Sequence, residues 1–234
     1  MTPGAEPSYA ASLAMAAGVR GRVMPISCGI DLSRFAAGTS GASFRAKHRL
    51  DSRPVVTYVG RLDVEKNVDV VIRACAVLGL DAQLLIVGVG AERRRLSALA
   101  SSLGVPVTFA GFVADCDLPA AYAATDVFVN AGTAELQSLV TLEALASGKP
   151  VVAADASALP HLVLDGTTGY LFPPGDAAAL ADRLRRMVSD PEGRERMGAA
   201  ARRLAKHHDQ DRTIRAFEQL YAFGTDRVAL KAVS

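Results

Sequence analysis

The sequence predicts an α/β fold in which helices cover both faces of a doubly wound, parallel sheet. Short apolar runs alternate regularly with longer amphipathic segments from Pro54 onwards, and such alternation is typical of βαβ units. The apolar runs lack polar alternation, as expected for strands buried on both faces. Glycines follow several of these runs. Ligands bind at the carboxyl ends of strands in such sheets, so we expect a site there.

The expected strands and helices follow from apolar runs and from start and stop signals. Ser138 can cap a helix that starts at Leu139, Gly148 ends that helix, and Asp176 can cap another. We expect strands over residues 55–59, 83–87, 107–109, 127–129, 151–153 and 170–172. We expect helices over residues 9–17, 68–78, 91–103, 118–123, 139–147, 176–188, 191–207 and 211–223. Residues 36–53 are rich in Gly, Ser and Arg without periodicity, which predicts a surface linker.

Composition excludes several classes of function. The net charge of +2 gives no bulk attraction to nucleic acid, and the absence of Trp leaves few stacking platforms for bases. The three cysteines are far apart and form no CxxC pair, which favours reduced thiols in a cytoplasmic setting. The chain shows no signal peptide and no apolar run long enough to span a bilayer. We therefore expect a soluble cytoplasmic protein, or one peripheral to a membrane.

Two carboxylates stand in the unit that follows the strand at 127–129. Glu135 lies in the loop and Glu143 lies in the next helix. The start of that helix, at Ser138, Leu139 and Val140, would offer unpaired N–H groups and a partial positive charge to a diphosphate. A carboxylate one turn further in could accept two hydrogen bonds from a ribose diol. The residue pattern therefore predicts a nucleoside diphosphate site, although an ordinary β–loop–α unit remains the alternative.

This unit resembles a known family signature. Residues 135–152 read E-L-Q-S-L-V-T-L-E-A-L-A-S-G-K-P-V-V. They resemble the E-x7-E signature of family 4 (group 1) retaining glycosyltransferases of the GT-B fold, commonly E-G-F-G-L-V-x-L-E-A-M-A-x-G-x-P-V-V. Here Leu136, Gln137 and Ser138 replace Gly-Phe-Gly. The resemblance implies that Glu143 holds the donor ribose and that Glu135 orients the donor sugar.

A second match follows the first expected strand. Gly60, Arg61 and Lys66 fit the family element G-R-L-x-x-x-K. An Arg fork and a Lys point charge suit a leaving diphosphate, and the resemblance gives Arg61 and Lys66 this catalytic role beside Glu135. Taken alone, the two cations could equally be surface charges.

Other motifs separate nucleotide sugars from dinucleotides. Gly88-x-Gly90 lacks the third glycine of the dinucleotide fingerprint, whose place Arg93 takes, and no acidic residue follows at the required spacing. This argues against an NAD oxidoreductase. We instead expect a tight turn at Gly88 that lets a nucleotide sugar approach, and the resemblance places Val113 at the base pocket through its backbone.

Two polar clusters have more ordinary interpretations. Asp115 and Asp117 have the D-x-D spacing of some metal-dependent glycosyltransferases, but we expect Asp117 to cap the helix at 118–123 and expect no metal or other cofactor. His161 could contact an acceptor or simply face water.

The resemblance implies the C-terminal, Rossmann-like donor-binding half of a GT-B enzyme. Residues 27–35 resemble the family's junction between its two domains, P-N-G-I-D-x-x-x-F. We therefore expect residues 1–35 to be a remnant of the N-terminal domain and junction, 36–53 a linker, 54–210 the donor-binding domain, and 211–234 a C-terminal helix and tail. The missing N-terminal domain would be encoded by the same gene or by a separate chain.

The expected function is retaining transfer of a hexose from a UDP- or GDP-sugar to a hydroxyl acceptor, with a lipid acceptor as one option. This chain alone would transfer little or nothing without the N-terminal domain. The alternatives are a non-catalytic nucleotide-sugar-binding module and a nucleotide-sugar epimerase.

Overall fold

The structure is a computed structural model that describes residues 9–18, 24, 26–35 and 38–231. Six parallel strands form one sheet in the order β3-β2-β1-β4-β5-β6. They are β1 (Val55–Val59), β2 (Gln83–Val87), β3 (Val107–Gly111), β4 (Val127–Asn130), β5 (Val151–Ala154) and β6 (Gly169–Phe172). This order runs outwards from β1 in one direction and from β4 in the other, so the doubly wound parallel sheet is confirmed.

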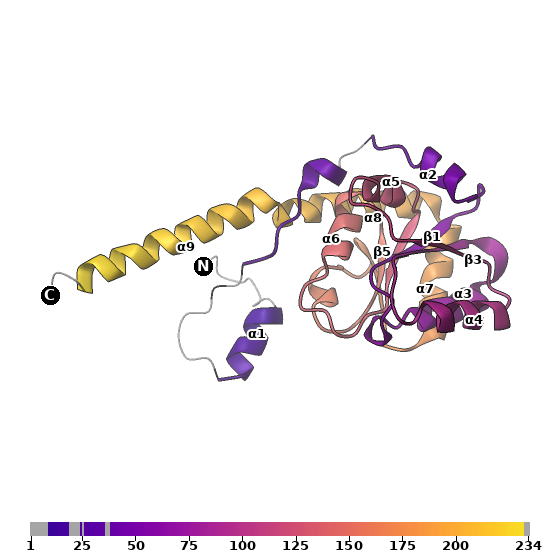
Figure 1. Cartoon of the computed structure of the whole chain (residues 1–234), viewed down its shortest axis with the longest axis horizontal. Helices are drawn as coiled ribbons and strands as arrows, with labels where there is room; N and C mark the ends of the chain where they lie inside the picture. The colour runs from indigo at the N-terminus through magenta and orange to yellow at the C-terminus, as the bar shows by residue number, and fades with distance from the viewer. Residues whose placement is uncertain (1–8, 19–23, 25, 36–37, 232–234) are drawn as a thin grey trace.

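Helices cover both faces of the sheet. They are α1 (Tyr9–Ala16), α2 (Ala42–Lys47), α3 (Val68–Leu78), α4 (Arg93–Ser102), α5 (Leu118–Ala123), α6 (Leu139–Ala146), α7 (Ala177–Ser189), α8 (Pro191–Ala205) and α9 (Gln210–Lys231). Helix α3 packs on α4 and α7, and on the other side α6 packs on α8 (Figure 1). Helix α9 projects away from the domain (Figure 1). None of the described helices combines the length and the apolar composition needed to span a bilayer.

The central strands form the core. Every residue of β1, β2, β4 and β5 is buried, whereas the residues of the edge strand β3 are half-buried. Large apolar side chains such as Phe128 and Leu142 have no exposed surface. Burial on both faces explains why these strands read as continuous apolar runs. It also gives the loops after β1 and β4 a rigid base.

The segment expected to be a linker packs against the domain. Within residues 38–53, helix α2 buries Phe44, and Leu50 is buried after it. The guanidinium of Arg45 donates to the carboxylate of Asp126 at 2.6 Å, and that carboxylate also accepts from the backbone N–H of Val55 at 2.8 Å. The expectation of a plain surface linker is therefore wrong here. Phe44 and Leu50 are too few and too widely spaced to produce a recognisable hydrophobic periodicity in the sequence.

The helix ends confirm some expected caps and correct others. Ser138 accepts a hydrogen bond from the N–H of Thr141 at 3.4 Å, and Asp176 accepts one from the N–H of Ala179 at 2.9 Å, as expected. Asp117 stands at the N-cap position of α5, as expected, but its side chain makes no capping hydrogen bond. Helix α9 runs well beyond residue 223, where we expected its end.

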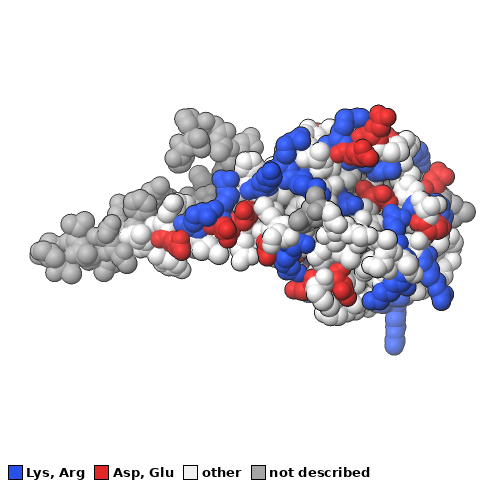
Figure 2. Space-filling view, turned by 90° about the horizontal axis from the view of Figure 1, so that it is seen from above, with Lys and Arg blue, Asp and Glu red and all other residues white. Residues whose placement is uncertain are grey.

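Charged side chains of both signs are interspersed on the face of the molecule shown in Figure 2. This distribution agrees with the small net charge of +2. On this face the chain therefore shows no continuous basic surface of the kind that binds nucleic acid.

Candidate functional site

The candidate site lies where the sheet changes winding direction. Strands β1 and β4 are neighbours in the sheet, and the loops that follow them leave towards opposite halves of the fold. A crevice at such a point binds ligands in open α/β sheets. A cavity of about 380 Å³ lies here between the two loops. It is lined by the predicted residues Gly60, Arg61, Lys66, Glu135, Ser138, Leu139 and Val140.

An ion pair joins the two loops inside the cavity. The ammonium of Lys66 lies 2.9 Å from Oε1 of Glu135, and the side chains are 17% and 12% exposed. Asn67 also donates from its amide to the carbonyl of Ala131 at 3.1 Å and to the hydroxyl of Thr133 at 3.3 Å. Both predicted groups are therefore at the site, where each is at present the other's partner.

Arg61 occupies the rim of the cavity. Its guanidinium pairs with Asp63 at 2.7 Å and with Glu65 at 3.3 Å, and its side chain is 71% exposed. Exposed pairs of this kind are weak, so the side chain can exchange partners at little cost. The structure thus brings Lys66 inside the cavity but leaves Arg61 at its edge.

A buried amide orients the start of α6 towards the cavity. Asn130, at the end of β4, donates to the hydroxyls of Ser138 at 3.0 Å and Thr141 at 3.2 Å. Its amide oxygen accepts from the N–H of Gly132 at 3.0 Å. These bonds hold the loop and the helix start in one arrangement. The first N–H groups of a helix have no partner within the helix, and the helix dipole adds positive character there. The site therefore suits an anionic group next to Leu139.

Glu143 lies one turn further into α6 than Leu139 and Val140, and it is not among the residues that line the cavity. The hydroxyl of Tyr122 in α5 donates to Oε2 of Glu143 at 2.7 Å. Burial raises the pKa of Glu143, while the Tyr122 hydrogen bond and the charge of Arg34 act to lower the pKa, and the charge of Asp115 acts to raise it. Glu143 is therefore held by α5 and lies within reach of the charge of Asp115 in the loop before α5. Val113, which packs partly buried against the core, belongs to the same loop.

The turn at Gly88 has a structural cause that we did not expect. Gly88 has φ +132°, and a Cβ atom there would lie 1.9 Å from the carbonyl oxygen of Gly60. Its own N–H donates to the carbonyl of Gly111 at 2.8 Å. The carbonyl of Gly60 therefore approaches Gly88 closely and requires a glycine there.

Several residues that line or support the site were not predicted from the sequence. Asn130 interrupts an apolar run at a strand end, and this signal could have identified it. Gln137 lines the cavity and contacts residues 27–28, and Tyr58 donates to the carbonyl of Arg61 at 2.7 Å. Arg34 donates to the carbonyl of Asp115 at 2.8 Å. No local pattern marks Arg34, because its partner lies far along the chain.

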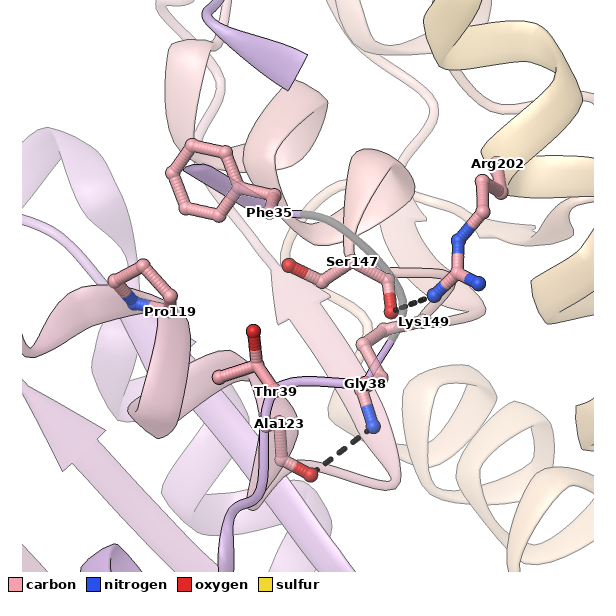
Figure 3. A pocket seen from close by; sticks show the side chains of 8 residues that line it. All are labelled: Phe35, Gly38, Thr39, Pro119, Ala123, Ser147, Lys149 and Arg202. Atoms are coloured by element: carbon pink, nitrogen blue, oxygen red, sulfur yellow. Dashed lines mark hydrogen bonds between the residues drawn. The ribbon is translucent and has the colours of Figure 1, made fainter. Parts of the chain in front are cut away.

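A second, smaller cavity lies near the residues that precede β4 and β5, and none of its lining residues is a predicted site residue. It has a volume of about 120 Å³, and Lys149, Arg202, Phe35 and Ser147 are among the residues that line it (Figure 3). The ammonium of Lys149 donates to the carbonyl of Ala123 at 3.2 Å, and Arg202 donates to the carbonyl of Ser147 at 3.0 Å. These cations satisfy carbonyls at the ends of α5 and α6, which accounts for them structurally.

Comparison with known protein families identifies the family of this chain. Residues 42–204 match the family described as "Glycosyl transferases group 1". The chain belongs to this family. An alpha-D-kanosaminyltransferase from Streptomyces kanamyceticus is 37% identical over 68% of this chain and 43% of its own length. The sulfoquinovosyl transferase of Arabidopsis thaliana is 38% identical over 67% of this chain and 31% of its own length.

Two solved structures share the fold. Anabaena Alr3699/HepE, crystallised with UDP and glucose, is 27% identical with a TM-score of 0.84 over 92% of this chain and 61% of its own length. Sucrose-phosphate synthase from Thermosynechococcus elongatus is 32% identical with a TM-score of 0.83, over 97% of this chain and 58% of its own length. The group 1 chain described here thus spans less than half of the two curated relatives named above, and about three fifths of these solved chains.

Proposed function

We propose that this chain is the donor-binding half of a retaining glycosyltransferase, which moves a hexose from a UDP- or GDP-sugar to a hydroxyl group. The observation that carries the proposal is the Lys66–Glu135 pair, 2.9 Å apart, in a cavity bordered by the start of α6. A cation, a carboxylate and free helix N–H groups are the groups needed to hold a diphosphate and the sugar attached to it.

The donor would occupy the site in an extended pose. Its diphosphate would lie at the N-terminus of α6, where Lys66 neutralises the charge that grows on the leaving group. Arg61 would leave its exposed acidic partners and add a second cation. Glu135, released by Lys66, would accept hydrogen bonds from sugar hydroxyls. Glu143 would receive the ribose diol on the side of α6 that faces Tyr122.

The proton balance follows the family resemblance. The bond between the sugar and the leaving phosphate oxygen breaks while the acceptor oxygen bonds to the same carbon. The leaving phosphate takes the proton of the acceptor hydroxyl, so no protein base is required. Lys66, Arg61 and the helix N–H groups supply positive charge to the diphosphate, and Glu135 faces the positive charge that develops on the sugar.

Donor and acceptor classes are proposed from relatives and from the surface of the site. A relative is named as GDP-mannose-dependent, and Anabaena Alr3699/HepE was solved with UDP-glucose, so both bases are candidates. Val64, Leu136 and Leu139 expose apolar surface beside the cavity. A Mycolicibacterium smegmatis relative is named as a phosphatidylinositol monomannoside mannosyltransferase. We therefore propose a lipid acceptor, reached by peripheral contact with a membrane from the cytoplasm.

Titration calorimetry with UDP-glucose, GDP-mannose and ADP-glucose tests the donor proposal. We expect the wild-type chain to bind one of them and Glu143→Ala to bind it at least about tenfold more weakly, since a charged hydrogen-bond acceptor is lost. Glu192→Ala, a change at an exposed glutamate of α8, is the matched control. Absence of binding by the wild-type chain to all three nucleotide sugars would refute the proposal.

The second half of the enzyme is a proposed partner. We expect the 234-residue chain to transfer no sugar by itself, because it spans less than half the length of the curated relatives named above, and to gain activity only when joined to an N-terminal GT-B domain. Liposomes carrying acceptor lipid, compared with soluble sugars, test the acceptor class with the joined enzyme. Product formed without any acceptor would identify an epimerase instead.

A further inference from the structure

Gln137 connects the loop that contains Glu135 to a distant segment of the chain. Its amide oxygen accepts from the N–H of Cys28 at 2.8 Å. Its amide nitrogen donates to the hydroxyl of Ser27 at 2.6 Å and to the carbonyl of Cys28 at 3.1 Å. Gln137 lies only two residues after Glu135 and borders the same cavity. The cavity wall is therefore attached to a segment more than one hundred residues earlier.

Residues 27–30 are in turn attached to the start of α9. Ser27 Oγ lies 2.8 Å from Nδ1 of His208, and its carbonyl accepts from the hydroxyl of Thr213 at 2.8 Å. The N–H of Ile30 donates to the carbonyl of His208 at 2.9 Å, and the N–H of Gln210 donates back to the carbonyl of Ile30 at 3.0 Å. The loop of the candidate site and the start of α9 thus share one support, the segment at Ser27.

Gln137 uses both its amide oxygen and its amide nitrogen to hydrogen-bond Ser27 and Cys28. A glutamine amide has two N–H donors, and both are used by Ser27 and Cys28. Because Ser27 accepts from Gln137, its single hydroxyl proton is free to be donated to Nδ1 of His208. Hydrogen bonds therefore link Gln137 through Ser27 to His208. Gln137 is consequently suited to hold the loop in place rather than to bind a donor itself.

We propose that Gln137 is a positioning residue for the donor site, and that it holds Glu135 beside Lys66 by hydrogen-bonding Ser27 and Cys28. The proposal rests on the proposed function, since it concerns the affinity of the same site for a nucleotide sugar. Of the other backbone contacts of this loop, the N–H of Ala158 donates to the carbonyl of Glu135 at 3.1 Å, and the N–H of Thr133 donates to the carbonyl of Glu65 at 3.4 Å. Neither holds the residues between Glu135 and α6. In that stretch Asn130 holds Ser138, and Gln137 makes the hydrogen bonds to residues 27–28.

A set of variants of the 234-residue chain tests the proposal by calorimetry with UDP-glucose and GDP-mannose. We expect Gln137→Leu and Ser27→Ala each to bind the nucleotide sugar about fivefold more weakly than the wild type, as lost neutral hydrogen bonds allow. The double variant should bind no more weakly than Gln137→Leu, because both changes break one chain of bonds. Ser27→Thr keeps the hydroxyl and should retain wild-type affinity.

Gln219→Ala, at an exposed glutamine of α9, is the matched control, and circular dichroism shows whether each variant is folded. A folded Gln137→Leu variant with the affinity of Gln219→Ala would overturn the proposal, as would fully additive losses in the double variant. If Gln137→Leu fails to fold, Ser27→Ala and Ser27→Thr decide the same question. Absence of binding by the wild type would reject the proposed function, and this inference with it.

Discussion

Lys66 and Glu135 form an ion pair at 2.9 Å although they stand in loops that follow different strands. The pair is mostly shielded from water. Removing either residue would therefore leave the other charge largely buried and without its partner. A bound diphosphate would compete with Glu135 for the ammonium of Lys66. This competition makes the affinity of the site for UDP sensitive to which member of the pair is changed.

We expect Lys66→Met to weaken UDP binding about tenfold, because a charged hydrogen bond to the diphosphate is lost. Glu135→Gln should bind UDP at least as tightly as the wild type, since the ammonium of Lys66 is released. Calorimetry with UDP, which has no sugar for Glu135 to contact, measures both. Equal weakening in the two variants would show that the intact pair, rather than the free ammonium, is what UDP requires.

Tyr122→Phe should raise the pKa of Glu143 further. The hydroxyl of Tyr122 donates to the carboxylate at 2.7 Å and opposes the rise that burial causes. A group whose pKa is raised on folding contributes stability at low pH, and this contribution is lost as the pH rises through the folded-state pKa. At neutral pH the variant should therefore lose about 1–2 kcal/mol in its free energy of unfolding. The loss should be smaller below pH 4.5, the reference pKa of the carboxyl.

Two measurements check this prediction. Carbon-13 NMR of the Glu143 carboxyl follows its titration directly, and urea unfolding at both pH values gives the free energies of unfolding. Tyr221→Phe, at a side chain that is 70% exposed, is the control. An unchanged titration of Glu143 in Tyr122→Phe would contradict the assigned hydrogen bond.

The contribution of His208 and His48 to the free energy of unfolding should fall as the pH drops below about 6.5. Burial, with smaller effects of His207 and Arg212, holds the pKa of His208 below its reference value of 6.5, and burial and Lys47 do the same for His48. The unfolded chain then binds protons that the folded chain does not, which favours unfolding as the pH falls from 6.5 towards the folded-state pKa. His208→Gln should flatten this dependence in urea unfolding, whereas a slope equal to that of wild type would exclude a contribution of His208.

Gly88→Ala should destabilise the protein strongly. The new Cβ would lie 1.9 Å from the carbonyl oxygen of Gly60, at a residue with φ +132°. We expect a loss of about 3 kcal/mol or more in the free energy of unfolding. Gly104→Ala has a positive φ of +65° but no heavy atom within 4 Å of the new Cβ, so it should lose only about 1 kcal/mol. Urea unfolding compares the two, and equal losses would mean that the approach to Gly60 is unimportant.

Local patterns in the sequence were sufficient to predict the sheet and to place Lys66 and Glu135 at one edge of it. The apolar runs at 55–59 and 127–129 are buried strands because burial on both faces requires continuous apolar residues. Lys66 and Glu135 follow these two strands, and parallel strands bring their carboxyl ends to one edge. The two charges could therefore be placed together without knowledge of any distance.

Only the tertiary structure determined how the side chains are used. Arg61 turns to nearby acids, Glu143 turns to Tyr122, and the glycine at 88 serves backbone packing. The contacts of Gln137 with residues 27–28 span more than one hundred positions. Such long-range contacts leave no period or spacing in the sequence. The partner of each polar group is determined by the tertiary structure and not by the residues next to that group in the chain.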